Sequence, residues 1–395
     1  MGPQLNPSHS ASLQASGAGR LLVASNYFES HKGGIEIVAG QLARALATGQ
    51  GFDVAWLAAN SSAPAADGSV RSISLRSWNG IERLLGLPIP LPLPGAIATI
   101  VREVRSSDVV MLHDTLYPSN LVAMLSAKWL GKPVLIVQHI GLVPYRNPVA
   151  RVLMKLADRF VSRPMLANAD QVVFISGLTR QHFSGVRFRR PPQLIFNGIR
   201  EELWAGTSLP ALESLTSDSP FTAIFVGRFV EKKGLPILRR LAAATPHIRW
   251  LICGWGDERP EDWGLANIEV RRNLDGVQLR RAYGEADLLV LPSVGEGLPL
   301  VVQEALALGL AVIGGADLVD ADPWLRGRMS GVHVDTGNLE GTVRQWQTEI
   351  ERIRQLSPRP NHTDETRDRY SWISISRRYA TLICSLARTT LPTRP

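Results

Sequence analysis

Short apolar runs alternate with segments of helical periodicity along most of the chain. The first run, residues 20–28, is followed by a turn at Gly33 and Gly34 and by residues 35–47, where apolar side chains recur at helical spacing. Further strand-like runs follow at 52–59, 108–114, 133–140 and 171–177. Strands that alternate with helices predict βα units and a parallel sheet.

A second series of the same kind begins after an interruption. Residues 206–220 are rich in Ser, Leu, Pro and Asp, and strand-like runs then follow at 221–228, 248–254, 286–293 and 310–315. A chain of 395 residues is long enough for two α/β domains that each bury a core. We therefore expect five parts: a tail over 1–18, a first domain over 19–200, a linker over 201–219, a second domain over 220–365, and a helix over 366–395 that packs back towards the first domain.

The composition suits a soluble, loop-rich α/β protein, since 45% of the residues are apolar and 20% are charged. The first eighteen residues lack the basic and apolar regions of a signal peptide, and no apolar run reaches the ~20 residues of a membrane-spanning helix. Cys253 and Cys384 lack the spacing of a zinc site or a disulfide framework, which fits a reducing compartment. We expect a cytoplasmic protein whose membrane contacts are peripheral.

The chain is strongly basic, with a formal net charge of +8 and a pI near 9.9. Such an excess predicts an anionic partner: nucleic acid, an acidic membrane surface or a phosphorylated substrate. Charge alone does not choose among these three.

One basic motif lies directly beyond a predicted strand of the second series. Arg228 and Lys233 fall in a loop that Gly234 closes before the next helix. Ligands of parallel α/β sheets bind beyond the carboxyl ends of the strands. Two fixed cations at such a place can hold a diphosphate and stabilise the charge that grows on it as it leaves. The alternative is a solvated basic loop.

An acidic motif follows, in which seven residues separate Glu296 from Glu304. Pro299 suits the first turn of the next helix, whose free backbone N–H groups would bind phosphate or sugar oxygens. Glu304, about one turn further on, can accept hydrogen bonds from two vicinal ribose hydroxyls, and Glu296 can meet the hydroxyls of a sugar. The alternative is that both glutamates only compensate the helix dipole.

In this order, the two motifs resemble those of the GT-B glycosyltransferases of family 4. The resemblance runs through 32–36, 138–141, 172–180, 195–199, 226–234, 286–309 and 369–379. It implies an α/β protein of the GT-B fold, in which two Rossmann-like parallel-sheet domains face a central cleft. It also implies a retaining sugar transfer from a nucleotide-diphosphate-sugar, with a UDP- or GDP-sugar as the donor.

The resemblance assigns roles to the residues of both motifs. Arg228 and Lys233 would bind the donor diphosphate, and Glu304 would bind the ribose. Glu296, together with the backbone of Gly297, Leu298, Pro299 and Leu300, would bind the transferred sugar. We expect Arg228, Lys233 and Glu296 to act in catalysis.

The resemblance also extends the site to other loops. Asn273 and Leu274, beside Arg272, correspond to the stretch that meets the nucleotide base. Gly33 and Gly34 match a loop of the first domain that comes close to the diphosphate or the acceptor.

Histidines follow two of the predicted strands in the first domain. His139 stands where such enzymes often carry a cleft histidine, and we expect it to contact donor or acceptor as a further catalytic residue. His113 and Asp114 form a second pair at a strand end, for which a structural and a functional role stay equally open.

The implied mechanism is front-face displacement, in which the departing diphosphate helps to deprotonate the acceptor hydroxyl. Asp320 and Asp322 spell an Asp-x-Asp metal motif, but they lie past the donor motif, where the resemblance places no metal. We therefore predict a metal-independent hexosyltransferase without a cofactor.

Two segments of the first domain point to a membrane. In 147–166, Arg151, Lys155, Arg159 and Arg163 recur every four residues among apolar ones, as in helices that lie on anionic lipid; residues 79–104 are apolar and too interrupted by proline for a strand or a spanning helix. We expect a lipid-linked saccharide acceptor of polysaccharide or glycolipid assembly, at the inner face of the cell membrane. The alternative is a packed helix with a solvated basic face beside a loop on the core.

Two other functions stay open. A GT-B enzyme of another chemistry, such as a sugar-nucleotide epimerase, would convert the donor without an acceptor. A basic nucleic-acid-binding protein would explain the charge, but the chain has no recognisable binding module and no aromatic residues interleaved with its basic ones. We expect no nucleic-acid partner.

Overall fold

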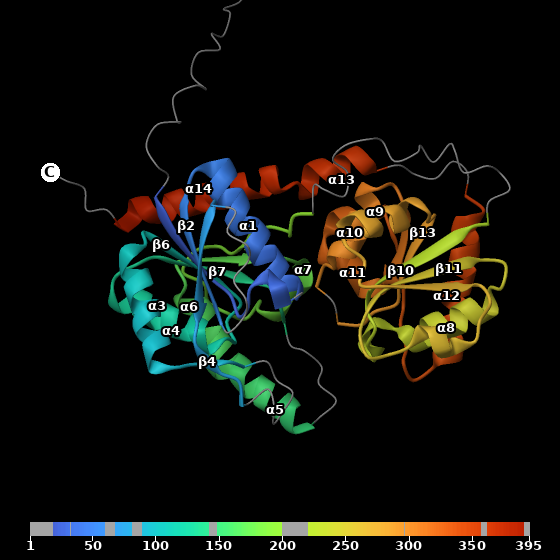
Figure 1. Cartoon of the computed structure of the whole chain (residues 1–395), viewed down its shortest axis with the longest axis horizontal. Helices are drawn as coiled ribbons and strands as arrows, with labels where there is room; N and C mark the ends of the chain where they lie inside the picture. The colour runs from blue at the N-terminus through green and yellow to red at the C-terminus, as the bar shows by residue number, and fades with distance from the viewer. Residues whose placement is uncertain are drawn as a thin grey trace, which may run out of the picture. The chain divides into compact units, whose positions relative to one another are not determined.

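The computed structural model describes residues 19–31, 33–59, 68–80, 89–141, 148–199, 220–295, 297–356 and 362–390. The expected tail over 1–18, the expected linker over 201–219 and Glu296 lie outside these ranges. Two parallel sheets with helices against their faces confirm the predicted α/β class (Figure 1). Backbone contacts divide the chain into a first unit, 1–136 with 168–171 and 376–395, and a second unit, 137–167 with 172–375.

The first sheet has the strand order β3-β2-β1-β6-β7-β8-β9. Its strands are β1 (Arg20–Ala24), β2 (Asp53–Ala59), β3 (Val70–Leu75), β6 (Val109–His113), β7 (Val134–Gln138), β8 (Gln171–Phe174) and β9 (Gln193–Leu194). Every residue of β6 and β7 is buried, as expected for central strands covered on both faces. The order reverses between β1 and β6, so the carboxyl ends of these two strands mark a ligand crevice.

Helices α1 (Gly34–Gln50), α3 (Pro94–Ser106), α4 (Pro118–Trp129), α7 (Gly177–His182) and α14 (Trp372–Thr390) accompany this sheet. The expectation that 79–104 is too interrupted by proline for a strand is wrong, whereas no membrane-spanning helix is found among its described residues. A two-residue strand β5 (Leu91–Pro92) pairs with β4 (Ser77–Trp78), and α3 follows at once. Pro94 does not break α3, because it occupies the first turn, where a missing N–H costs nothing.

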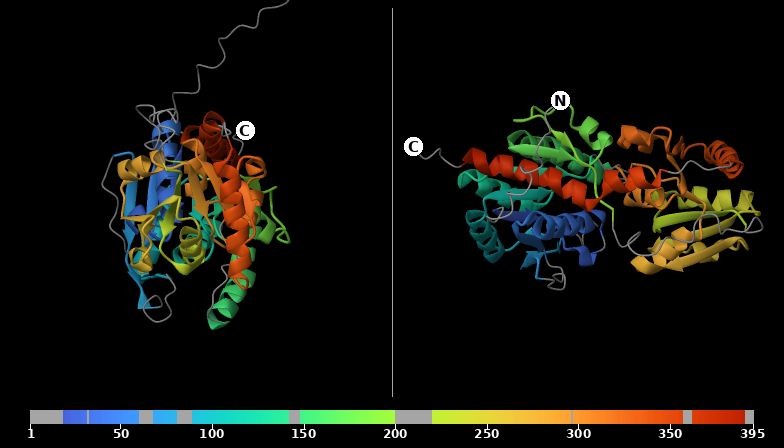
Figure 2. Two further views of the ribbon diagram at one scale, coloured as in Figure 1. Left: turned by 90° about the vertical axis from the view of Figure 1, so that its right-hand side faces the viewer. Right: turned by 90° about the horizontal axis from the view of Figure 1, so that it is seen from above.

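The second sheet has the order β12-β11-β10-β13-β14-β15, and its neighbouring described strands pair in parallel. Its strands are β10 (Thr222–Arg228), β11 (Arg249–Trp255), β12 (Ile268–Arg272), β13 (Leu288–Leu291), β14 (Ala311–Gly315) and β15 (Ser330–Val332). Helices α8 (Leu235–Ala244), α9 (Gly276–Gly284), α10 (Leu300–Ala307), α11 (Ala316–Ala321), α12 (Leu339–Arg354) and α13 (Thr363–Tyr370) complete it (Figure 2). Here the order reverses between β10 and β13.

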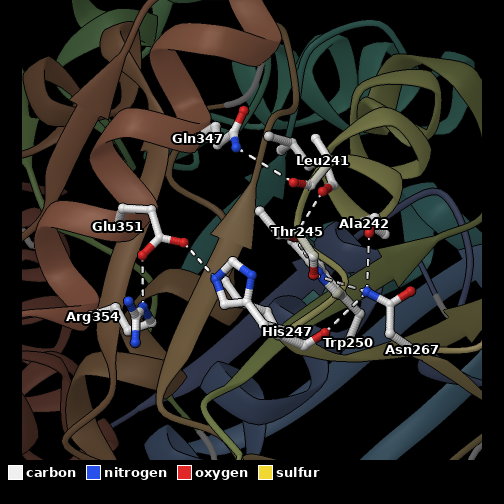
Figure 3. A network of polar contacts seen from close by, with 11 residues as sticks. Leu241, Ala242, Thr245, His247, Trp250, Asn267, Gln347, Glu351 and Arg354 are labelled. Carbon is white, nitrogen blue, oxygen red and sulfur yellow. Dashed lines mark hydrogen bonds and ion pairs between the residues drawn. The ribbon is translucent and has the colours of Figure 1, made fainter.

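A polar network ties the end of α8 to the start of β11 and to α12 (Figure 3). The side-chain amide of Asn267 donates to the backbone oxygens of Ala242, Thr245 and Ile248, each at 3.0 Å. His247 Nε2 lies 2.6 Å from Oε1 of Glu351 on α12. These bonds fix the amino-terminal edge of the sheet, opposite the edge where its ligand loops emerge.

Candidate functional site

The loop after β10 and the loop after β13 are locked together at the reversal point of the second sheet. Gly234 follows the short 3-10 helix η5 (Glu231–Lys233) with a φ of +79°, and a Cβ there would collide with the backbone oxygen of Pro292. Val294 N donates to Lys232 O at 3.2 Å. Only glycine tolerates both the positive φ and the close approach of Pro292. The loop after β10 and the loop after β13 therefore hold one fixed arrangement.

Arg228 ends β10 and lies in register with Trp255, which ends β11. The guanidinium carbon of Arg228 sits 4.8 Å from the centroid of the Trp255 ring, and the side chain is exposed. Among the residues that the structure describes, no carboxylate pairs with it. The indole face therefore orients the cation while its N–H groups remain able to bind an anion.

Lys233, the second predicted cation, ends η5 in the same loop and is half-buried. The structure thus places both predicted cations at the carboxyl end of β10, at the reversal point: Arg228 is the last residue of the strand, and Lys233 lies in the loop that follows. Trp255, which positions Arg228, was missed in the sequence, because only the β10–β11 register brings it there.

Glu304 lies on α10, one turn from its start, and is 3% exposed. The hydroxyl of Tyr283, a fully buried residue of α9, donates to Glu304 Oε2 at 3.1 Å. A carboxylate removed from water needs such donors, since burial without them is costly. Tyr283 was also missed, because nothing in the sequence pairs α9 with α10.

The start of α10 differs by one residue from the expectation. Pro299 is the N-cap rather than a residue of the first turn, and the helix begins at Leu300. Pro299 makes no side-chain cap, so among the described residues no N-cap side chain occupies the first N–H groups of α10, which suit a ligand. Leu298 is buried, and a Cβ on Gly297 would lie 3.4 Å from Ser176 Oγ and 3.7 Å from the backbone oxygen of His139.

The guanidinium of Arg272 is bound by other groups of the protein. Its Nη2 lies 3.0 Å from Glu261 Oε2, its Nη1 donates to Gly256 O at 2.9 Å, and it stacks over the Phe229 ring. The hydrogen bond from Arg272 lowers the pKa of Glu261 to about 2. Arg272 therefore shapes the loop after β11.

Asn273 and Leu274, which follow Arg272 in the stretch predicted to meet the base, differ in exposure. Asn273 is exposed in the left-handed region with a φ of +54°, and its N–H donates to Gly254 O at 3.0 Å. Leu274 packs against the core. Asn273 is thus the more exposed member of this stretch, and contact of either residue with a base stays a prediction.

The structure places His139 directly after β7, where it is 6% exposed. Its backbone oxygen accepts a hydrogen bond from Thr179 Oγ1 at 3.4 Å. The strand-end position is as predicted, and the catalytic role stays a prediction.

At the reversal point of the first sheet, Gly33 caps α1 and Gly34 is its first residue. A Cβ on Gly33 would collide with Oε2 of Glu36, whose side chain folds back over the turn. Burial raises the pKa of the Glu36 carboxyl, and the charge of Asp114 raises it further. Sequence reasoning missed Glu36, which lies beside the predicted glycines.

His113 and Asp114 are buried at the end of β6. Burial of the ring lowers the pKa of His113 to about 3, so the imidazole is neutral at physiological pH. Asp114 adopts a φ of +69°, and Asn120 Nδ2 donates to the backbone oxygens of both residues, at 2.8 and 2.9 Å. These bonds hold a backbone conformation that non-glycine residues rarely adopt.

Both aspartates of the Asp-x-Asp sequence pair with side chains of the protein. Asp322 is fully buried, and its carboxylate accepts from Arg369 Nε at 2.7 Å and from Tyr370 OH at 2.8 Å. Asp320 pairs with Arg326 at 2.9 Å. The buried Asp322 carboxylate thus ties the segment after α11 to α13, whereas the Asp320–Arg326 pair is exposed and local.

Comparison with known proteins decides the family. The profile described as "Glycosyltransferase Family 4" matches residues 32–203, and that described as "Glycosyl transferases group 1" matches residues 220–347. The chain belongs to glycosyltransferase family 4. This confirms the resemblance to family 4 and makes the protein a glycosyltransferase.

Two curated relatives show how much of the chain is shared. Alpha-maltose-1-phosphate synthase of Mycobacterium tuberculosis is 29% identical over 272 residues, 62% of this chain and 69% of that protein. The lipopolysaccharide core biosynthesis glycosyltransferase LpsE of Rhizobium meliloti is 27% identical over 49% of this chain and 57% of its own.

Solved structures confirm the predicted GT-B fold. HepE of Anabaena, crystallised with UDP and glucose, covers 93% of this chain and 100% of its own, with a TM-score of 0.68 at 15% identity. Sucrose-phosphate synthase of Thermosynechococcus elongatus covers 94% and 100%, with a TM-score of 0.68 at 18% identity. Within the described residues of this family 4 glycosyltransferase, no helix has the length and apolarity to cross a membrane.

Proposed function

We propose that this glycosyltransferase moves a hexosyl group, with retention of configuration, from a nucleotide-diphosphate-sugar to a hydroxyl of a lipid-linked saccharide. The observation that carries the proposal is the placement of Arg228 and Lys233 at the reversal point of the second sheet. A sheet of this order binds ligands there, and two cations there match a diphosphate.

The remaining donor contacts follow from the same site. Glu304 binds the ribose hydroxyls, and Asn273 with Leu274 meets the base. Glu296 and the backbone of 297–300 hold the transferred sugar. The UDP and glucose in the HepE crystals support a nucleotide-sugar of this kind.

The proposed chemistry needs no metal. The bond between the anomeric carbon and the diphosphate oxygen breaks, the acceptor oxygen bonds to that carbon on the same face, and its proton passes to the departing diphosphate. Arg228 and Lys233 stabilise the negative charge that grows on this leaving group. Gly33 and Gly34 approach the diphosphate or the acceptor, and His139 contacts one of the two.

Two observations support a lipid-linked acceptor. One is the basic and apolar segments of the chain, and the other is the likeness to LpsE, a relative named for lipopolysaccharide core biosynthesis. The enzyme would then work at the inner face of the cell membrane, in polysaccharide or glycolipid assembly.

The test is a donor screen. The full chain is incubated with UDP-, GDP- and dTDP-sugars, with and without membrane lipid extract and with and without EDTA, and nucleotide release is followed. We expect one donor to turn over only with extract, to be insensitive to EDTA, and to give a product that keeps the donor's anomeric configuration by NMR. Turnover without any acceptor would favour epimerase chemistry instead, and no turnover with any donor would contradict the proposal.

A further inference from the structure

A helix over residues 148–168 presents apolar side chains to solvent. It runs through α5 (Pro148–Ala157), a π-helical turn η2 (Asp158–Ser162) and α6 (Arg163–Asn168) (Figure 1). Val152, Leu153, Leu156 and Phe160 are 58%, 44%, 48% and 67% exposed. Four large apolar residues so exposed on one short helix form a patch, unlike the scattered exposed residues of ordinary surfaces.

These residues share one side of the helix. Val152 and Leu156 follow one another about one turn apart on α5, and Leu153 flanks them. Phe160 follows about one turn further on, in the wider π-helical turn η2. The opposite side holds the positions that face the protein: Met154, Ala157 and Val161 are half-buried, and Ser162 is buried. The apolar row is therefore the outer face of a helix already seated on its own protein.

Two exposed cations, Lys155 and Arg159, border the row, and a third exposed cation, Arg151, lies one turn before Lys155, toward the Met154 side of the helix. The fourth predicted cation does not belong with them, because Arg163 turns inward, where its Nε bonds Asp158 at 3.1 Å and its guanidinium lies over the Phe183 ring. Asp158, half-buried, is the one acidic residue of this helix, and that bond occupies it. The docking face, Arg151, Val152, Leu153, Lys155, Leu156, Arg159 and Phe160, thus carries positive charge and no carboxylate.

We propose that the docking face binds an anionic lipid bilayer, with its apolar row at the boundary of headgroups and acyl chains and its cations on lipid phosphates. An exposed face that combines an apolar row with a cationic border has the chemistry of an interfacial helix. A second copy of the chain fits less well, because a symmetric pair of these faces would oppose cations to cations. The proposal builds on the lipid-linked acceptor of the proposed function and names the surface that reaches it.

The test uses vesicles and needs no catalysis. The full chain is floated with vesicles of phosphatidylcholine alone or of phosphatidylcholine with phosphatidylglycerol, at low and high salt. We expect binding to the anionic vesicles, at least tenfold tighter than to neutral ones, and weaker binding at high salt, which screens the cations.

Two variants separate the parts of the docking face. Leu153→Gln/Leu156→Gln/Phe160→Gln removes the apolar row, and Arg151→Gln/Lys155→Gln/Arg159→Gln removes the cations. Each should weaken binding to anionic vesicles at least tenfold. Unchanged melting temperature and nucleotide affinity show that both still fold.

The matched control removes three exposed arginines elsewhere, in Arg239→Gln/Arg240→Gln/Arg344→Gln, for the same change in net charge. It should bind vesicles like the wild type. If it weakens binding as much as the cation variant does, net charge rather than this face attracts the chain, and the proposal fails.

Three other results would overturn the proposal. The first is equal binding to neutral and anionic vesicles, and the second is no vesicle binding at all. The third is concentration-dependent self-association in light scattering that the apolar variant abolishes, which would assign the face to a second copy. Vesicle binding without turnover of any donor would leave the docking face standing and remove the proposed transferase reaction, so the two failures are distinguishable.

Discussion

At the scale of single residues, the sequence predicts the two cations near the end of β10, but the residues that support the site do not show in the sequence. Arg228 and Lys233 were recognisable, since two cations beyond a strand end form a local pattern. Trp255 and Tyr283 were not, because each joins its partner only through a strand pairing or a helix contact. Glu296 lies outside the described residues, so its role remains the prediction made from the sequence.

Tyr283 positions Glu304 in this account, which predicts a specific effect of Tyr283→Phe. Losing one hydrogen bond to the carboxylate should weaken binding of the donor's nucleoside diphosphate about three- to tenfold, as expected for one such bond. The loss should shrink for the 2′-deoxy nucleotide, which has no vicinal hydroxyl pair. Calorimetry with both nucleotides measures this. An equal loss for both would show that Tyr283 only supports the fold.

His113 predicts a pH dependence of stability. Its folded pKa is lowered to about 3, so below about pH 6.5 the unfolded chain binds a proton that the folded chain does not. The contribution of His113 to the free energy of unfolding is therefore fully present above pH 6.5. Below pH 6.5 it falls by about 1.4 kcal/mol per pH unit. Urea unfolding at pH 7 and pH 5 should show a smaller loss for His113→Gln than for the wild type. Equal losses in the two proteins would contradict a buried neutral imidazole.

At the scale of elements, uniformly apolar strands were predictable and mixed ones were not. The sequence runs over β1, β2, β6, β10 and β13 predicted those strands, because central parallel strands are buried on both faces. β12 was missed, because all its residues are half-buried and its three charged residues, Glu269, Arg271 and Arg272, hide the apolar pattern of a strand. Glu269 and Arg271 pair with each other there, at 2.6 Å.

The lock between the loops after β10 and β13 predicts a costly glycine replacement. Gly234→Ala should lower the free energy of unfolding by more than about 2 kcal/mol, because it adds a collision with Pro292 to the strain of a positive φ. Gly264→Ala is the matched control: its φ of +69° is similar, but no atom lies within 4 Å of the added Cβ, so about 1 kcal/mol is expected. Denaturant unfolding compares them. Similar losses would mean that the two loops are not locked.

At the scale of the whole molecule, alternating strands and helices sufficed to predict two parallel sheets, and the resemblance supplied the GT-B fold that solved structures confirm. Strand order required the structure, since apolar runs carry no information about their neighbours. That order matters most for function: both sheets reverse after their first strand, and each reversal point holds a predicted glycine or basic loop. The acceptor has no such motif, and its assignment depends on surface chemistry.

The central claim is that the reversal point of the second sheet binds a diphosphate through Arg228. The most direct measurement compares the affinities of a nucleoside diphosphate and of the nucleoside alone for the wild type, Arg228→Ala and the exposed-arginine control Arg239→Ala. We expect Arg228→Ala to weaken binding of the diphosphate at least tenfold and to leave binding of the nucleoside unchanged, and the control to match the wild type. Unchanged diphosphate affinity in Arg228→Ala, or an equal loss for the nucleoside, would contradict the central claim.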